Sequence, residues 1–188
     1  VIRGLAQQIA GEPGHPDTAR RAAEIMEEAD ITTDRLGNFL RYARLRDPVL
    51  RPLAAAPQLE RVAGLVADDF RAAGIELHLE LAPLFILADS EMLSQAVLNL
   101  LLNSRKFTPT GGRVTLALRQ TSAERAELSV ADTGQGISAD LLPNLFKPYV
   151  GHRDGHGLGL AMIRRTADLS GWKVIVNSHP GCGTTVVI

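Results

Sequence analysis

The sequence has little of several features that mark large classes of protein. Its 188 residues include one cysteine, Cys182, so no internal disulfide can form. Lysine and arginine number 20 against 21 aspartates and glutamates, which leaves a net charge of -1. This balance provides no broad positive surface for nucleic acid or an anionic membrane. We therefore expect neither as a partner.

Long apolar runs are also missing. Charged residues interrupt them well short of the ~20 apolar residues of a membrane-spanning helix, and no signal peptide opens the chain. No Cys/His group has zinc spacing, and with a single cysteine this favours a cytoplasmic protein. The chain starts inside an expected helix and stops inside an expected strand. We therefore expect both ends to be cut, which leaves open an inner-membrane anchor in the full-length protein.

Residues 1–47 predict a helical hairpin. Ile2, Leu5 and Ile9 are spaced three and four residues apart, and the same spacing resumes from Ala22 to Ala43 after a break rich in glycine and proline. Two helices bury too little apolar surface alone, so we expect a homodimer with a four-helix bundle. Residues 48–56 contain prolines and alanines and predict a linker with one short edge strand.

Residues 57–188 predict a second domain, of the α+β class. Hydrophobic periodicity predicts helices at residues 58–73, 90–105, 138–145 and 158–170. It predicts strands at residues 75–81, 85–88, 113–119, 126–132, 172–177 and 184–188. We expect a two-layer α/β sandwich, with helices over one mixed, mostly antiparallel sheet.

A polar stripe runs along the helix expected after residue 90. Gln95, Asn99, Asn103 and Lys106 fall on one face at 100° per residue. Apolar residues cover the remaining surface: Met92, Leu93, Ala96, Val97, Leu100 and Leu101. Because two carboxamides and an ammonium on a buried helix need a partner, the stripe predicts an anionic ligand.

Two glycine-rich segments extend this site. Strand alternation aims Asp132 at the core, and the turn with Gly134 and Gly136 would admit a purine whose amino group hydrogen-bonds the carboxylate. A capping aspartate is the alternative, favoured for this short motif alone. Residues 155–160 run into a helix whose free N–H groups suit phosphate, although a surface loop is the alternative. Residues 145–154 predict a hinged lid.

Taken in order, these segments resemble the sequence boxes of two-component sensor histidine kinases. The matching motifs are Asn99-x3-Asn103-x2-Lys106-Phe107, Asp132-x-Gly134-x-Gly136-Ile137, Phe146-x-Pro148-Tyr149, Gly157-Leu-Gly159-Leu160 and Gly181-Cys-Gly183-Thr184-Thr185. The hairpin resembles the dimerisation and histidine-phosphotransfer helices of that family. The resemblance implies a Bergerat-type ATP-binding fold with ATP and Mg²⁺ as cofactors.

The resemblance also implies roles for single residues. Asn103 would ligate Mg²⁺ with Asn99 nearby, and Lys106 would pair with phosphate. Asp132 would accept from the adenine amino group, supported by Thr184. The remaining implied contacts are Phe107, Gly134, Gly136, Ile137, Tyr149, Arg153, Gly155, Gly157, Leu158, Gly159 and Leu160. Arg153 departs from the family pattern, because Gly151-His152-Arg153 stands where many relatives have Thr-Thr-Lys.

Asn99 bears on the type of reaction. Related ATPases carry a glutamate there to activate water, and a neutral carboxamide is a poor general base, so phosphotransfer is favoured over hydrolysis. None of the five histidines matches the phosphoacceptor box, so we expect that histidine upstream of Val1. The implied function is the core of a sensor kinase that passes phosphate on to a response-regulator aspartate. An anti-sigma-factor-like serine kinase, a non-catalytic nucleotide-binding scaffold and a regulatory phosphatase are the alternatives.

Overall fold

The computed structural model describes residues 21–27, 29, 32–33, 46–147 and 158–188. In the N-terminal region the described residues are helical, as the sequence predicts there. The rest of the hairpin lies outside the described residues, so the four-helix dimer stays a prediction, as do the domain limits. The described residues from Arg46 onward belong to one compact unit, which holds the strands and the larger helices.

Five strands form the main sheet in the order β2-β4-β5-β7-β6. Their bounds are Glu76–Leu81 for β2, Arg113–Ser122 for β4, Arg125–Asp132 for β5, Ile175–Ser178 for β6 and Thr184–Val187 for β7. Strand β2 is parallel to β4, and the other neighbours are antiparallel. The prediction of a mixed, mostly antiparallel sheet is confirmed.

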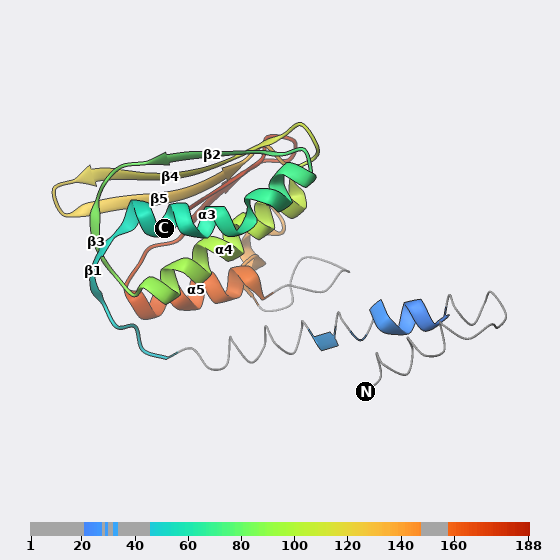
Figure 1. Cartoon of the computed structure of the whole chain (residues 1–188), viewed down its shortest axis with the longest axis horizontal. Helices are drawn as coiled ribbons and strands as arrows, with labels where there is room; N and C mark the ends of the chain where they lie inside the picture. Colours follow the sequence, from blue (N-terminus) through green and yellow to red (C-terminus); the bar gives the residue numbers. More distant parts are fainter. Residues whose placement is uncertain (1–20, 28, 30–31, 34–45, 148–157) are drawn as a thin grey trace. The chain divides into compact units, whose positions relative to one another are not determined.

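Three helices cover one face of this sheet (Figure 1). They are α3 (Ala55–Ala72), α4 (Ser90–Phe107) and α5 (Gly159–Ser170). The core between helices and sheet includes fully buried side chains from both layers: Leu59, Phe70, Val97, Leu100, Leu101, Val114, Leu116, Leu118, Val130 and Ile163. Because α4 packs against α3, α5 and the sheet, the position of its polar stripe relative to these elements is fixed.

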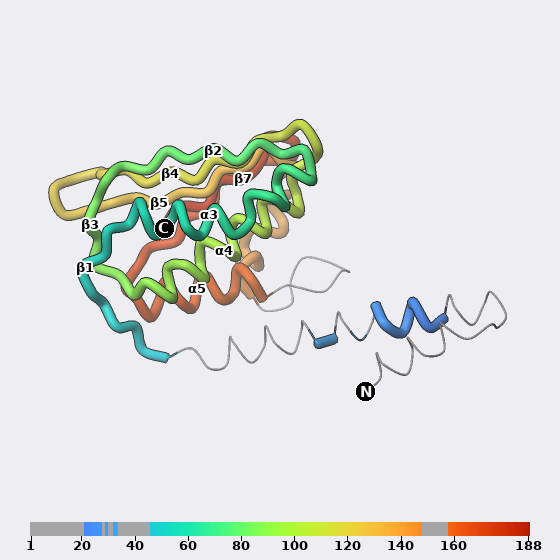
Figure 2. Tube along the Cα trace, viewed as in Figure 1, coloured from blue at the N-terminus to red at the C-terminus, as the bar shows by residue number. Residues whose placement is uncertain are grey.

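The expected linker strand pairs differently from a simple edge strand. β1 (Arg51–Ala54) and β3 (Phe85–Ala88) form a separate two-stranded antiparallel sheet. Figure 2 shows the two segments side by side where the trace enters α3. The amide of Ala55 then donates to the carbonyl of Leu84 at 3.0 Å, which joins the start of α3 to the same sheet.

The expected helix over residues 138–145 is wrong in type. Only a 3-10 helix, η1 (Leu142–Asn144), forms there, flanked by turns. The amides of Leu141, Asn144 and Leu145 donate three residues back, and Pro143 has no amide hydrogen with which to extend an α-helical ladder. The last strands also differ at their ends, since β6 begins at Ile175 rather than at Trp172.

Asp89 ties the segment before β1 to the N-terminus of α4. Its Oδ1 accepts from the amides of Glu91 and Met92, both at 3.1 Å, which caps the helix. Its Oδ2 accepts from Arg46 Nη1 at 2.7 Å and from the Val49 amide at 2.8 Å. Burial alone would raise the pKa of Asp89, but Arg46 and these amides outweigh it and lower the pKa to about 2.

This lowered pKa predicts acid sensitivity. An aspartate with a lowered folded-state pKa stabilises the fold fully above its ordinary pKa of 3.8 and loses that contribution as the pH falls toward about 2. The contribution near neutral pH is on the order of 2 kcal/mol. In Arg46→Met the pKa of Asp89 rises toward its ordinary value, so the variant should be less stable near neutral pH and should lose less stability as the pH falls from about 4 to about 2. Urea unfolding measured across this pH range tests this.

The control is Glu91→Gln. The Glu91 carboxylate also contacts Arg46, at 3.1 Å from Nη2, but its side chain is 83% exposed. An exposed pair of this kind contributes little, so the loss of stability at low pH should be the same as in the unchanged protein. If Arg46→Met leaves the dependence of the free energy of unfolding on pH unchanged, the assignment to Asp89 is contradicted.

Candidate functional site

The polar stripe of α4 lies as the sequence predicts. All six apolar residues expected to cover the remainder of the helix are buried. Asn99 and Asn103 are half-buried, and Lys106 is exposed at the C-terminal end. The Lys106 ammonium stands 5.6 Å from the centre of the Phe107 ring, so cation and aromatic ring share that end of the helix.

The Asp132 carboxylate lies at the end of β5, beside the C-terminal turn of α4. Its Oδ1 accepts from the amides of Gly134 at 2.9 Å and Thr184 at 3.1 Å. Its Oδ2 has a longer contact, 3.3 Å from Ser104 Oγ. Burial raises the pKa of Asp132, and these three donors oppose the rise. Oδ2 is thus the oxygen with the weaker partner and the greater capacity for another donor.

A second hydrogen-bonded layer, centred on buried Ser178, supports this carboxylate. Ser178 Oγ accepts from the Ile137 amide at 2.8 Å and lies 2.9 Å from both the Gly183 carbonyl and Thr184 Oγ1. It therefore joins the glycine turn after Asp132 to the loop before β7. The sequence did not single out Ser104 or Ser178, because nothing in their local pattern shows the partners that helix packing brings to Ser104 and strand pairing brings to Ser178.

Both glycines of the turn after Asp132 stand where any side chain would collide with backbone. A Cβ at Gly134 would overlap the Phe107 carbonyl oxygen, and one at Gly136 would overlap the His179 carbonyl oxygen. Gly136 also has a positive φ of 69°, which favours glycine. Other segments of the chain therefore pack closely against this turn at both glycines.

The start of α5 lies against Asn103. A Cβ added at Gly159 would be 3.4 Å from Asn103 Nδ2 and 3.7 Å from its Oδ1. Leu158 is buried and gives the helix no side-chain cap, while half-buried Leu160 packs against the core. The first amides of α5 therefore have no capping side chain, and the carboxamide of Asn103 stands next to them.

Asn99 lies one helical turn before Asn103. Its Oδ1 accepts from Gln95 Nε2 at 3.2 Å. Its Nδ2 is buried and has no hydrogen-bond partner among the residues that the structure describes. A buried donor without a partner is costly, so this position calls for an acceptor from outside the described part of the chain.

Four predicted site residues lie outside the described residues: Tyr149, Arg153, Gly155 and Gly157. The expected lid falls largely on the same segment and stays a prediction. Within the described ranges no helix is long and apolar enough to cross a membrane. The same residues contain no group of three or more histidine, cysteine, aspartate or glutamate side chains that could hold a metal ion.

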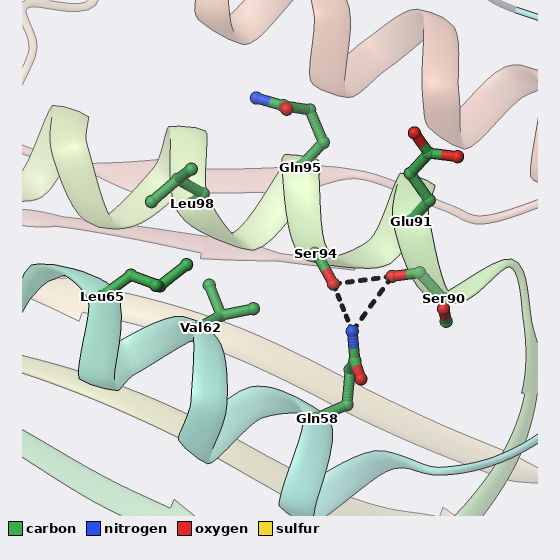
Figure 3. A pocket seen from close by; sticks show the side chains of 8 residues that line it. All are labelled: Gln58, Val62, Leu65, Ser90, Glu91, Ser94, Gln95 and Leu98. Carbon is green, nitrogen blue, oxygen red and sulfur yellow. Dashed lines mark hydrogen bonds between the residues drawn. The ribbon is translucent and has the colours of Figure 1, made fainter.

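A separate pocket of about 250 Å³ opens between α3 and α4 (Figure 3). Gln58 of α3 donates to Ser94 Oγ and to the Ser90 carbonyl of α4 across it. Leu65 and Leu98 are among its apolar walls. Gln95 also lines the pocket and connects it to Asn99 through the hydrogen bond described above.

Mg-ATP fits the residues present. Asp132 Oδ2, whose one contact is the 3.3 Å hydrogen bond from Ser104, can accept from a further donor such as a purine amino group. The buried Nδ2 of Asn99 and the uncapped start of α5 offer donors, as phosphate requires. Asn103 offers one neutral oxygen ligand, which suits Mg²⁺ because that ion keeps several waters and takes few protein ligands.

Comparison with known proteins identifies the family. Residues 88–188 match the family described as histidine kinase-, DNA gyrase B-, and HSP90-like ATPase. The chain is 31% identical over 186 residues to sensor histidine kinase ZraS of Klebsiella oxytoca, covering 97% of this chain and 40% of ZraS. Full-length ShkA, solved in complex with AMPPNP, superposes with a TM-score of 0.79 at 30% identity, covering 99% of this chain and 41% of ShkA.

A third structure, histidine kinase ThkA in complex with the response regulator TrrA, has a TM-score of 0.77 over 99% of this chain and 55% of that one. At 19% identity it shows the shared fold. The chain spans between 21% and 41% of the length of three curated sensor histidine kinases that it matches, ZraS of Klebsiella oxytoca among them. The chain belongs to the histidine kinase-, DNA gyrase B- and HSP90-like ATPase family, and its relatives there are sensor histidine kinases. The family predicted from the sequence is confirmed.

Proposed function

We propose that this chain is the catalytic core of a two-component sensor histidine kinase. It binds Mg-ATP along α4 and delivers the γ-phosphoryl group to a histidine upstream of Val1. The observation that carries the proposal is the order of groups along one helix. Ser104, beside Asp132, marks the purine end, and Asn103 faces the start of α5, with Asn99 one turn farther on.

At the purine end, Asp132 Oδ2 would accept from the adenine amino group. The Gly134 and Thr184 amides hold the other oxygen and keep the carboxylate oriented. Phe107 would lie against the base. Ile137 shares the supporting layer because its amide is fixed by Ser178.

At the phosphate end, Asn103 would ligate the metal ion and the first amides of α5 would donate to phosphate oxygens. Lys106, beside Phe107 at the C-terminal end of α4, would add a point charge for the phosphates nearest the base. Mg²⁺, when bound, neutralises phosphate charge and orients the transferred group. Asn99 is neutral and does not act as a general base, which favours transfer to a protein side chain over hydrolysis.

The same proposal includes the partners. The N-terminal helices would form the homodimer and present the phosphoacceptor histidine, and a response-regulator receiver domain would take the phosphoryl group onto an aspartate. ThkA, which has the same fold, was solved with its response regulator, and that complex supports this step.

Asn103→Ala tests the metal role. Loss of a metal ligand should weaken Mg-ATP about ten-fold or more while changing metal-free ATP by about two-fold or less. Calorimetry with Mg²⁺ and with EDTA measures both affinities. Asn177→Ala is the matched control, because Asn177 is exposed on β6. Equal losses with and without the metal would show that Asn103 does not act as its ligand.

A further inference from the structure

Gln95 makes a contact that the proposed function leaves without a role. Its Nε2 donates to Asn99 Oδ1 at 3.2 Å, from one turn earlier on α4. Figure 3 shows the Gln95 side chain directed away from α3, whereas Gln58 and Ser94 join α3 to α4. Gln95 is therefore available to act on the polar stripe rather than on the packing of the two helices.

This hydrogen bond decides which end of the Asn99 carboxamide is presented. A carboxamide has one oxygen that accepts and one NH2 group that donates. Gln95 occupies the oxygen, so the NH2 group is directed elsewhere. That group is buried without a partner in the described part of the chain. Asn99 is thus set as a donor and not as a metal ligand.

The position of Asn99 on α4 indicates what it would donate to. Ser104 contacts Asp132, so the purine end of the site lies at that level of the helix. Asn99 precedes Ser104 by five residues, or about 7.5 Å along the helix axis. Asn103 and the start of α5 lie between them. Asn99 therefore corresponds to the end of the phosphate chain most distant from the base.

We propose that Gln95 is a positioning residue that locks Asn99 with its NH2 group toward the terminal phosphate of ATP. This inference rests on the proposed function. Phosphate oxygens only accept hydrogen bonds, so the opposite orientation would place the amide oxygen against them. The pair would give the site a preference for ATP over ADP, because ADP lacks the phosphate that Asn99 contacts.

Gln95→Glu tests this directly. A carboxylate cannot donate, so it would accept from Asn99 Nδ2 and turn the amide oxygen toward the phosphate. We expect Mg-ATP affinity to fall about ten-fold or more, the range for a lost hydrogen bond to a charged group. Mg-ADP affinity should change by about two-fold or less. Calorimetry of the 188-residue chain with each nucleotide gives the ATP-to-ADP ratio.

The Asn99→Ala background separates positioning from simple charge repulsion. If Gln95 acts through Asn99, Gln95→Glu should change the ATP-to-ADP ratio no further when Asn99 is already alanine. Repulsion by the new carboxylate would persist in that background. Gln120→Glu is the matched control, because it adds the same charge at an exposed position of β4. Should Gln95→Glu fail to fold, Gln95→Met enters the same cycle, with an expected loss of about three-fold for Mg-ATP.

The outcomes are distinct. A reduced ATP preference in Gln95→Glu that vanishes with Asn99→Ala supports the inference. An unchanged ratio, or a reduction that persists with Asn99→Ala, overturns it. If the wild-type chain binds neither nucleotide, the proposed function itself fails.

Discussion

Replacing Asp132 by asparagine is expected to weaken ATP binding about a hundred-fold, the largest functional effect of any single change at this site. The asparagine oxygen can still accept from the Gly134 and Thr184 amides, which forces its NH2 group into the place of Oδ2. That NH2 group would then face the Ser104 hydroxyl and the adenine amino group. Two donors would meet where the native carboxylate accepts.

Calorimetry with ATP and GTP measures this loss. Because the carboxylate carries the discrimination, the variant should lose most of its preference for adenine. Asp140→Asn is the matched control, since Asp140 is exposed in the turn before η1. Wild-type affinity in Asp132→Asn would remove Asp132 from the base-binding role.

Low pH should also weaken ATP binding, because burial raises the pKa of Asp132 and the protonated form no longer accepts fully.

Gly183→Ala is expected to cause the largest loss of stability. Gly183 has a φ of 82°, and an added Cβ would overlap the backbone carbonyl oxygen of Asp132. Backbone cannot rotate away as a side chain can, so β5 and β7 would separate where Asp132 pairs with Thr184. The positive φ and the overlap together should cost about 3 kcal/mol or more.

The glycines provide their own control. Gly111 has a φ of 84°, close to that of Gly183, but an added Cβ there would meet nothing within 4 Å. Gly111→Ala should therefore cost only the conformational part, about 1 kcal/mol. Urea unfolding of both variants isolates the effect of the overlap. Equal losses would show that the contact with Asp132 is accommodated, and ATP binding would then be expected to survive in Gly183→Ala.

Periodicity made much of the fold predictable. The 3.6-residue pattern identified the buried face of α4, and alternation along β5 identified Asp132 as facing inward, since Leu128 and Val130 are buried. Both signals are local. The helix expected over residues 138–145 failed because Pro143 breaks the amide ladder that hydrophobic spacing alone does not register.

Features set by long-range pairing were not predictable. Ser178 meets Ile137 across 41 residues, and Asp132 meets Thr184 across 52, only because β7 pairs with β5 and β6 pairs with β7. The hydrogen-bonded ion pair between Arg46 and Asp89 likewise joins residues 43 positions apart. The sequence places Gln95 on the polar stripe, but its hydrogen bond to Asn99 depends on the conformations of the two side chains, which the sequence does not specify. The roles implied for single site residues stay predictions.

The most direct test of the proposed kinase core uses a chain that carries the histidine proposed to lie upstream of Val1. It is incubated with Mg²⁺ and γ-labelled ATP, and the stability of any protein-bound label is measured in acid and in base. The proposal predicts a label that acid removes and base does not, as for phosphohistidine, and its absence in Asp132→Asn. An acid-stable label would instead indicate a serine kinase. No label despite normal ATP binding would indicate a nucleotide-binding scaffold, and either result would contradict the proposed function.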